Sequence, residues 1–397
     1  MTVVSKEQLK AQQDELVSIR RDIHRHPETA YEENRTSDVV AAKLTEWGIE
    51  VHRGLAKTGV VGTLKGKRPG QRAIGLRADM DALFINEQNT FEHRSSHDGK
   101  MHACGHDGHT TMLLGAARRL SQDPDFAGTV HFIFQPAEEG GAGGRVMIEE
   151  GLFNLFPCDA VYGMHNMPGT QVGKFAVRPG PMMAAADLWN ATFHGTGGHG
   201  AMPHLGTDPT IPAAQFVIGA QSIIGRNVTS TDAAVISVGH IHGGAASAHS
   251  VIPADVAIAG TARSFKPAVR DLLERRLGEL ARGIAQAHGC TVDFHYDRRY
   301  PALINAPEQT EVAMAAARKT VGDENVNGNV TPIMGAEDFA FMLEAKPGAY
   351  ILIGNGGDGN GGGCHHIHTP LYDFNDVIIE TGVSYWTNLV AEELRAP

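Results

Sequence analysis

The sequence lacks the features that point to a membrane, to nucleic acid or to an oxidising compartment. No apolar run approaches the roughly 20 residues that span a bilayer, and the polar N-terminal segment has no apolar core typical of a signal peptide. Basic residues are in deficit, 34 Lys and Arg against 45 Asp and Glu, so a net charge of −11 offers no positive field to nucleic acid or anionic lipid. The chain has four cysteines, too few for a disulfide framework at this length: Cys104, Cys158, Cys290 and Cys364. We therefore expect a cytoplasmic protein in which at least one cysteine has another purpose.

The size and composition of the chain are those of an ordinary globular protein. Its 397 residues exceed the roughly 250–300 at which a single core stops growing, so two domains are expected. The 47 glycines cluster at 140–144, 195–200 and 354–363. Such clusters indicate tight turns and close backbone approach near a site, although the third is equally well interpreted as a plain loop.

The first 180 residues alternate between short apolar segments and helical patterns. Strands are predicted at 73–78, 129–134 and 159–164, and helices at 6–25, 33–47, 108–120 and 144–150. Asp107 is expected to cap the helix at 108–120, and Gly151 to end the helix at 144–150. Alternation of this kind predicts an α/β fold with a mixed, largely parallel sheet flanked by helices.

The pattern changes near residue 182. Strands are predicted at 186–194, 234–241 and 254–262, and helices at 209–225 and 268–288. This order favours a smaller α+β domain, residues 181–292, inserted into a larger one made of 1–180 and 293–397. In the last segment we expect a helix that opens at Glu337, a strand at 349–353 and a final helix near 375–394.

Three polar sets directly follow three predicted strands. Asp79 and Asp81 follow the first strand, Glu138 and Glu139 the second, and His165 the third. Because ligand sites in open α/β sheets lie outside the carboxyl ends of the strands, these side chains are expected to be neighbours.

The stretch HACGHDGHT places a cysteine and a histidine two residues apart on a glycine-bearing loop. Thiolate, imidazole and carboxylate together suit a transition metal. The candidate ligands are Cys104, His106, Glu139, His165 and a histidine of GCHHIHTP (363–370). Five ligands exceed the three of a typical mononuclear catalytic zinc, which indicates two ions about 3.5–4 Å apart with a bridging ligand. Cys104 is a plausible bridge.

The adjacent Glu138 and Glu139 need separate tasks, because neighbouring residues in an extended segment point in opposite directions. One can bind metal while the other takes a proton from an activated water molecule. We assign Glu138 as general base and Glu139 as ligand, although the spacing alone does not order them. His102, His109 and His365 are candidates for supporting contacts.

Eight motifs along the chain, from about residue 15 to 390, together resemble the metal-dependent amidohydrolases of the aminoacylase and carboxypeptidase group. Within it, the sequence is most similar to the branch of hippurate hydrolases, N-acyl-L-amino-acid amidohydrolases and plant auxin-conjugate hydrolases. The motifs are RADMDAL (77–83), HACGHDGHTTMLLGAA (102–117), FQPAEEGGAGG (134–144), GMHNMPGTQVG (163–173), GTGGHGAMPH (195–204), VIPADVAIAGTARSF (251–265), MGAEDFAF (334–341) and IHTPLYDFND (367–376).

The resemblance implies a catalytic domain, an inserted lid domain and a binuclear site that holds zinc, manganese, cobalt or nickel. The implied metal ligands are Cys104, His106, Glu139, His165 and His368, the last because the family's histidine lies two residues before a proline, here Pro370. Glu138 is implied as the general base, and Asp81 as a residue that orients a ligand side chain. In the lid, His199 is implied to steady the scissile carbonyl, in some relatives across subunits, and Arg263 to bind the substrate carboxylate.

The implied function is hydrolysis of the amide bond of N-acyl amino acids, which releases a carboxylic acid and a free amino acid. The implied assembly is a homodimer or homotetramer formed through the lid. Two alternatives stay open: a dipeptidase or aminopeptidase that recognises a free amino terminus, and a non-catalytic metal-loaded binding protein. The sequence departs from the branch at Phe84, where proline is common, and at Ser250, where asparagine is usual.

Overall fold

The computed structural model describes residues 6–357, 363 and 365–395. The chain divides into two compact units. The larger contains the residues up to Gly180, Ile304–Thr331 and the residues from Asp338 onward, and the smaller contains Pro181–Leu303 and Pro332–Glu337.

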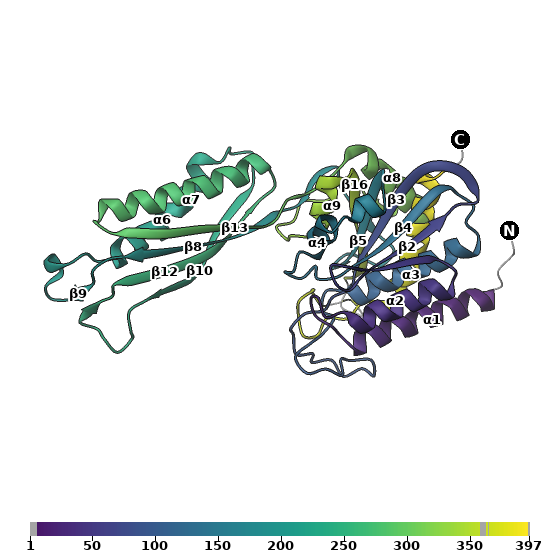
Figure 1. The fold of residues 1–397 in the computed structure, drawn as a ribbon, viewed down its shortest axis with the longest axis horizontal. Coiled ribbons are helices and arrows are strands. Elements are labelled where there is room, and N and C mark those ends of the chain that lie inside the picture. The colour runs from purple at the N-terminus through teal and green to yellow at the C-terminus, as the bar shows by residue number, and fades with distance from the viewer. Residues whose placement is uncertain (1–5, 358–362, 364, 396–397) are drawn as a thin grey trace. The chain divides into compact units, whose positions relative to one another are not determined.

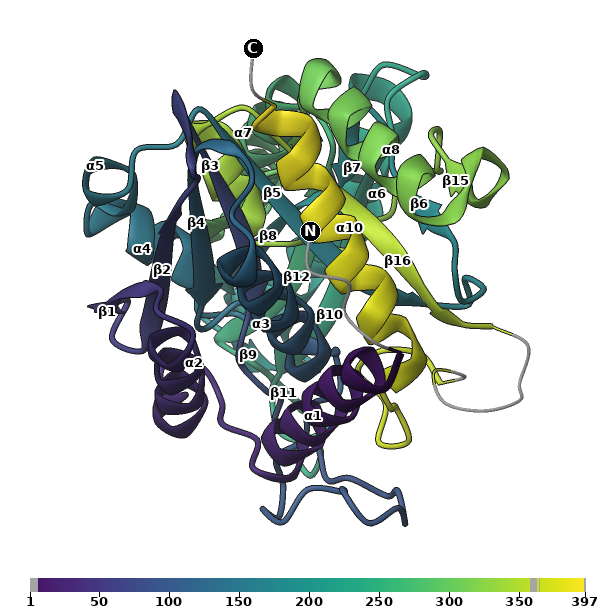
Figure 2. The same ribbon diagram turned by 90° about the vertical axis from the view of Figure 1, so that its right-hand side faces the viewer.

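The larger unit is built on an eight-stranded mixed sheet, in the order β1-β2-β4-β3-β5-β16-β6-β15 (Figures 1 and 2). Its strands are β1 (Glu50–Leu55), β2 (Gly59–Lys65), β3 (Arg68–Asp79), β4 (Ala127–Gln135), β5 (Ala160–Pro168), β6 (Phe175–Ala176), β15 (Val326–Asn327) and β16 (Gly348–Gly356). The four central strands β4, β3, β5 and β16 run parallel, whereas β1, β2 and β6 pair in antiparallel fashion. The predicted largely parallel α/β sheet is therefore confirmed.

Helices cover both faces of this sheet. They are α1 (Lys6–Arg25), α2 (Asn34–Glu46), α3 (His106–Gln122), α4 (Gly143–Glu149), α5 (Leu152–Leu155), α8 (Pro307–Val321), α9 (Phe339–Ala345) and α10 (Ile379–Glu393). Helices α1, α2, α3, α8 and α10 share one core with β5 residues such as Tyr162 (Figure 2). The next residue, Gly163, faces Phe339 of α9 and Tyr350 of β16. Since successive strand residues point to opposite faces, β5 is buried on both sides and reads as a continuous apolar run.

The smaller unit is an antiparallel sheet with two helices packed on it. Its strands β8 (Ala185–His194), β10 (Ala234–Gly243), β12 (Asp255–Ser264) and β13 (Thr291–Tyr300) lie in the order β10-β12-β8-β13. Trp189 and Phe193 of β8 share a buried core with Phe216 of α6 (Thr210–Asn227) and Leu273 of α7 (Pro267–Ala287). Alternate β8 residues such as Leu188 are exposed, as expected for an antiparallel sheet with one covered face. Short elements complete the chain: β7 (Gly180–Met183), β9 (Gly198–His199), β11 (Val251–Ile252), β14 (Leu303–Asn305) and the 3₁₀ turns Pro203–Leu205, Asp323–Asn325 and Asp376–Ile378.

The structure corrects three details of the predicted organisation. The second domain boundary, expected near residue 293, falls inside β13, which pairs with β8 over nearly its whole length, so the smaller unit continues to Leu303. Asp107 does not cap α3: the helix begins at His106, two residues earlier than predicted, so Asp107 lies in its first turn. The Asp107 carboxylate accepts hydrogen bonds from Arg20 and His24 instead. His165 lies within β5, paired with Leu352 of β16, rather than after the strand.

Candidate active site

The predicted site residues of the larger unit gather at the carboxyl ends of its central strands. Asp79 is the last residue of β3, Glu138 and Glu139 follow β4, and His165 lies near the end of β5. Because β3 pairs with both β4 and β5, the three segments are adjacent. Cys104 stands in the loop before α3 and also reaches this edge.

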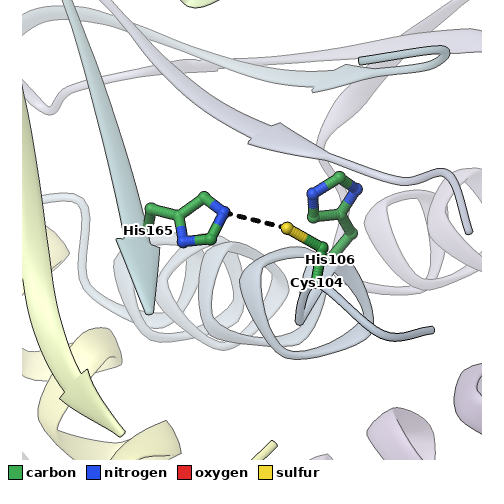
Figure 3. Close-up of side chains that lie close together, drawn as sticks. All are labelled: Cys104, His106 and His165. Carbon is green, nitrogen blue, oxygen red and sulfur yellow. Dashed lines mark hydrogen bonds between the residues drawn. The ribbon is translucent and has the colours of Figure 1, made fainter. Parts of the chain in front are cut away.

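All five predicted metal ligands come together in two overlapping groups. The ligand atoms of Cys104, His106 and His165 lie within 4.8 Å of one another, and so do those of Cys104, Glu139 and His368. Figure 3 shows the Cys104 sulfur directed toward the His165 ring, with His106 beside it. The sulfur lies 3.3 Å from His165 Nε2. Cys104 is the member common to both groups, which is the position that a bridging ligand requires.

His106 has the hydrogen-bonding pattern of a metal ligand. Its Nδ1 lies 3.3 Å from an Asp81 carboxylate oxygen, so Nδ1–H donates there and Nε2 faces the site. Although burial disfavours the charged ring, Asp79 and Asp81 raise the pKa of His106 to about 10. With this pKa, Nε2 carries a proton at neutral pH when no metal is bound. A cation has to displace that proton, so metal affinity depends on pH.

A hydrogen bond at Nδ1 also orients the His165 ring, so that its Nε2 faces the site. Its Nδ1–H donates to the backbone oxygen of Asn166 at 2.5 Å, which leaves Nε2 as an acceptor toward Cys104. Burial, together with the neighbouring His109, lowers the pKa of His165 and keeps the ring neutral, the form that binds metal.

The Cys104 thiol is fully enclosed in acidic surroundings. Burial raises the pKa of Cys104 well above its usual range, and the carboxylates of Glu139 and Glu138 raise it further. Positive charge is therefore required before this side chain can act as a thiolate, and bound divalent cations supply that charge.

Asp81 organises the segment that carries both glutamates. One of its carboxylate oxygens accepts the backbone N–H of Glu138 at 3.0 Å, and the other accepts that of Glu139 at 2.9 Å. Because Asp81 also holds His106, one buried carboxylate fixes a predicted ligand and the predicted base together. The Glu138 carboxylate in turn accepts the backbone N–H of Asp338 at 3.3 Å.

His368 lies on a loop in an unusual backbone conformation. Its φ is +62°, in the left-handed region that is uncommon for side-chain-bearing residues, and its N–H donates to the Ala103 carbonyl at 2.7 Å. This bond ties the C-terminal loop to the segment that carries Cys104. His366 and His365 are exposed, and Cys364 lies outside the described residues.

The donor set fits divalent transition-metal ions. Two buried atoms of the site, His106 Nε2 and Glu139 Oε1, have no hydrogen-bond partner among the described residues. Glu139 Oε1 does lie 3.1 Å from His368 Nε2, but without hydrogen-bond geometry. Orphaned buried polar atoms are costly unless something else coordinates them. Thiolate, imidazole and carboxylate are the donors that zinc, cobalt, nickel and manganese use.

A second buried network supports the predicted ligands. Asp79 accepts from His109 Nδ1 at 2.6 Å and from Arg77 at 2.7 Å, and His109 Nε2 accepts the backbone N–H of Asn166 at 2.9 Å. The Asn166 side chain donates to the Cys104 carbonyl at 2.6 Å. Asn166 and Arg77 were not predicted as site residues. Their position near His165 and Asp79 in the motifs could have indicated a role in the site. Their hydrogen-bond partners, however, are determined only by the fold.

His199 and Arg263 belong to the smaller unit. His199 is exposed on β9, and its Nδ1 accepts the Ala201 N–H at 3.1 Å, which leaves Nε2–H as a donor. Arg263 is half-buried on β12, where it donates to the Ala262 carbonyl and to the Thr261 hydroxyl. Burial lowers the pKa of Arg263. The roles of both residues toward substrate stay predictions.

The two departures from the expected motifs lie on the surface. Phe84 is 77% exposed, with the Lys100 ammonium 5.7 Å from its ring centre. Ser250 is exposed, and its carbonyl accepts the Gly200 N–H at 2.7 Å, beside His199.

A thiol, imidazole and carboxylate cluster with a neighbouring carboxylate, at the carboxyl ends of a parallel sheet, defines a metal-dependent hydrolase. The model of Peptidase family M20/M25/M40 matches residues 75–392, and the chain belongs to this family. It is a metal-dependent amidohydrolase.

Its relatives cover nearly the whole chain. The hippurate hydrolase of Campylobacter jejuni is 39% identical over 383 residues, 96% of this chain and 97% of that protein. The N-acetyl-L-cysteine deacetylase of Bacillus subtilis is 38% identical, over 94% of this chain and 86% of that protein. A crystal structure of a Bacillus subtilis protein, described as a dinuclear metal-binding peptidase from the M20 family, has a TM-score of 0.84 at 33% identity and covers 98% of this chain.

Within the described residues, no helix combines the length and the apolar character needed to cross a bilayer.

Proposed function

We propose that the enzyme hydrolyses the amide bond of N-acyl amino acids and uses two divalent cations held by Cys104, His106, Glu139, His165 and His368. One observation carries the proposal: the Glu138 carboxylate lies within 4.8 Å of ligand atoms of His106 and Glu139, whose inward atoms are orphaned. A carboxylate beside a metal pair, but not needed as a ligand, has the position of a general base. The hippurate hydrolase and deacetylase relatives support acylated substrates.

The residues divide the work as follows. Bound divalent cations acidify water and stabilise negative charge on oxygen. Glu138 removes a proton from the attacking water and later returns it to the leaving amine as the C–N bond breaks. His199, through its Nε2–H, steadies the negative charge that develops on the carbonyl oxygen. Arg263 presents a planar fork to the carboxylate of the amino-acid part.

The test is a substrate panel on metal-stripped protein restored with zinc, manganese, cobalt or nickel. N-acetyl, N-benzoyl and indole-acetyl amino acids are expected to be hydrolysed, whereas dipeptides with a free amino terminus are not. Preference for the free dipeptides would establish a peptidase instead. Stoichiometric metal with no hydrolysis across the panel would establish a binding protein.

We also propose that the smaller unit acts as a lid and joins two copies of the chain. Its helix α6 presents Ile211 and Ile218 on one exposed stripe, and Leu205 lies just before the helix; these side chains are 48%, 75% and 74% exposed. Neighbouring exposed apolar side chains favour a protein interface.

The free thiols Cys104, Cys158 and Cys290 are consistent with a cytoplasmic location.

A further inference from the structure

Glu33 is a buried carboxylate for which the chemistry above has no task. It lies just before α2, more than a hundred positions from the catalytic glutamates in sequence, and is completely buried. One oxygen accepts the backbone N–H groups of Tyr31 and Ala137, each at 2.9 Å, and the other accepts the Thr58 hydroxyl at 2.6 Å.

The residue that Glu33 holds is the one before Glu138. Ala137 has a φ of +56°, a left-handed conformation that costs a non-glycine residue about 1–2 kcal/mol and persists only where the surroundings enforce it. On the other side of its Cα atom, the Ala137 carbonyl accepts the Gly143 N–H at 3.0 Å. Two hydrogen bonds, one at the N–H and one at the carbonyl of Ala137, therefore fix the turn that directly precedes Glu138.

A second contact comes from the same N-terminal segment. The Tyr31 hydroxyl donates to the Gly141 carbonyl at 2.6 Å, beyond Glu139 in the loop. Tyr31 is itself left-handed, with a φ of +64°, and its N–H is one of the two that Glu33 accepts. Tyr31 and Glu33 thus hold the loop that carries Glu138 and Glu139 by hydrogen bonds at two points, Gly141 and Ala137.

We propose that Glu33, assisted by Tyr31, is a positioning residue that holds the 137–141 loop so that Glu138 is aimed at its water; this rests on the proposed function of Glu138. Burial raises the pKa of Glu33 to about 7, so a neutral side chain is tolerated at this position. Glutamine can keep the same pattern, since its oxygen accepts both N–H groups while its amide donates to Thr58. Methionine has a similar length but cannot accept either one.

The experiment compares Glu33→Met and Glu33→Gln with Glu32→Gln. Glu32 is the matched control because it directly precedes Glu33 in the chain and its side chain is 66% exposed. Hydrogen exchange without added metal is read at the amides of Glu138, Glu139 and Gly143, none of which bonds Glu33 directly. Glu33→Met is expected to speed exchange at all three amides. At saturating metal it is expected to lower kcat by about 10- to 100-fold with little change in KM. Glu33→Gln and the control should match the wild type in both readouts.

Two results would overturn the proposal: unchanged exchange in Glu33→Met, or faster exchange with an unchanged kcat per metal-loaded folded molecule. If Glu33→Met does not fold, Tyr31→Phe serves, because it removes only the bond to Gly141. It should speed exchange in the loop and lower kcat several-fold. If exchange or kcat does not change, the proposal that Glu33 and Tyr31 hold the loop is rejected as well. Failure of the proposed function would show separately, as full turnover in a Glu138→Gln variant, while the exchange data would still decide whether the loop is held.

Discussion

Glu138 and Glu139 are neighbours in the chain, yet their carboxyl groups have different surroundings. Glu139 shares a group of ligand atoms with Cys104 and His368, whereas Glu138 accepts the N–H of Asp338. Glu138 also lies within 4.8 Å of ligand atoms of His106 and Glu139, so the assignment of Glu139 as ligand and Glu138 as base, which spacing alone does not order, stays a proposal.

Replacing Glu138 by glutamine is therefore expected to separate turnover from metal binding. The change removes the proton acceptor and keeps the shape, so kcat should fall by about 10²–10⁴-fold, the usual contribution of a general base. Metal content, measured by atomic emission, should stay at the wild-type value. Glu149→Gln, on an exposed side chain of α4, is the control. A Glu138→Gln enzyme that turns over normally would remove the residue from the mechanism.

Glu33 gives the stability of the protein a pH dependence that one variant isolates. Burial raises its pKa to about 7 from 4.5. Between these values the folded state binds more protons at this position than the unfolded state, so wild-type stability falls relative to Glu33→Gln as pH rises. The difference should change by about 3 kcal/mol between pH 4.5 and 7. Denaturant unfolding of both proteins across this range measures it, and a pH-independent difference would contradict the assignment.

At the scale of elements, the loops that carry the site are shaped by left-handed residues. Gly105 lies between Cys104 and His106 with a φ of +100°, Ala137 precedes Glu138, and His368 itself has a φ of +62°. Each is placed where the chain must turn sharply to present a side chain at the sheet edge. Such strain collects at functional sites when the surrounding contacts enforce it.

Gly105→Ala tests how tightly this turn is packed. An added Cβ would lie 2.2 Å from the Asn166 side-chain nitrogen and 2.5 Å from the Tyr372 hydroxyl. We expect a loss of about 2–4 kcal/mol of stability from overpacking and backbone strain together, with weaker metal binding. Gly99→Ala is the control, because Gly99 has a φ of +76° but open space around it, and should lose about 1 kcal/mol. Equal losses in thermal or urea unfolding would show that packing at Gly105 is loose.

The elements differ in how far sequence predicts them. Strands β4, β5 and β16 were predicted because they are buried on both faces and so form uninterrupted apolar runs. Strands β1 and β2 and helix α8 were not placed, and the boundary expected near 293 falls inside β13. The motifs that carry the predicted ligands were recognised because their residue types are unusual. Glu33 was missed because a carboxylate before a helix looks ordinary until the fold brings Ala137 to it.

At the scale of the whole molecule, the two units carry different parts of the proposed chemistry. The larger holds the five proposed metal ligands and Glu138, and the smaller holds His199 and Arg263. Neither unit contains the complete residue set, so the proposed reaction needs both.

The proposed assembly of two chains is testable on α6. Ile218→Asp places a charge on the exposed apolar stripe and should convert a dimer into monomers in sedimentation or light scattering, since a buried unpaired charge is costly. Leu155→Asp is the control, because Leu155 is also exposed but lies in the larger unit. A wild-type protein that is monomeric at micromolar concentration would refute the assembly.

The central claim is that five side chains from distant segments hold a pair of cations. Anomalous diffraction from crystals grown with zinc tests it most directly. We expect two peaks, with Cys104 Sγ bound to both at about 2.3 Å and His106, Glu139, His165 and His368 bound at about 2.0–2.2 Å. A single ion, or ions bound away from these five side chains, would contradict the account.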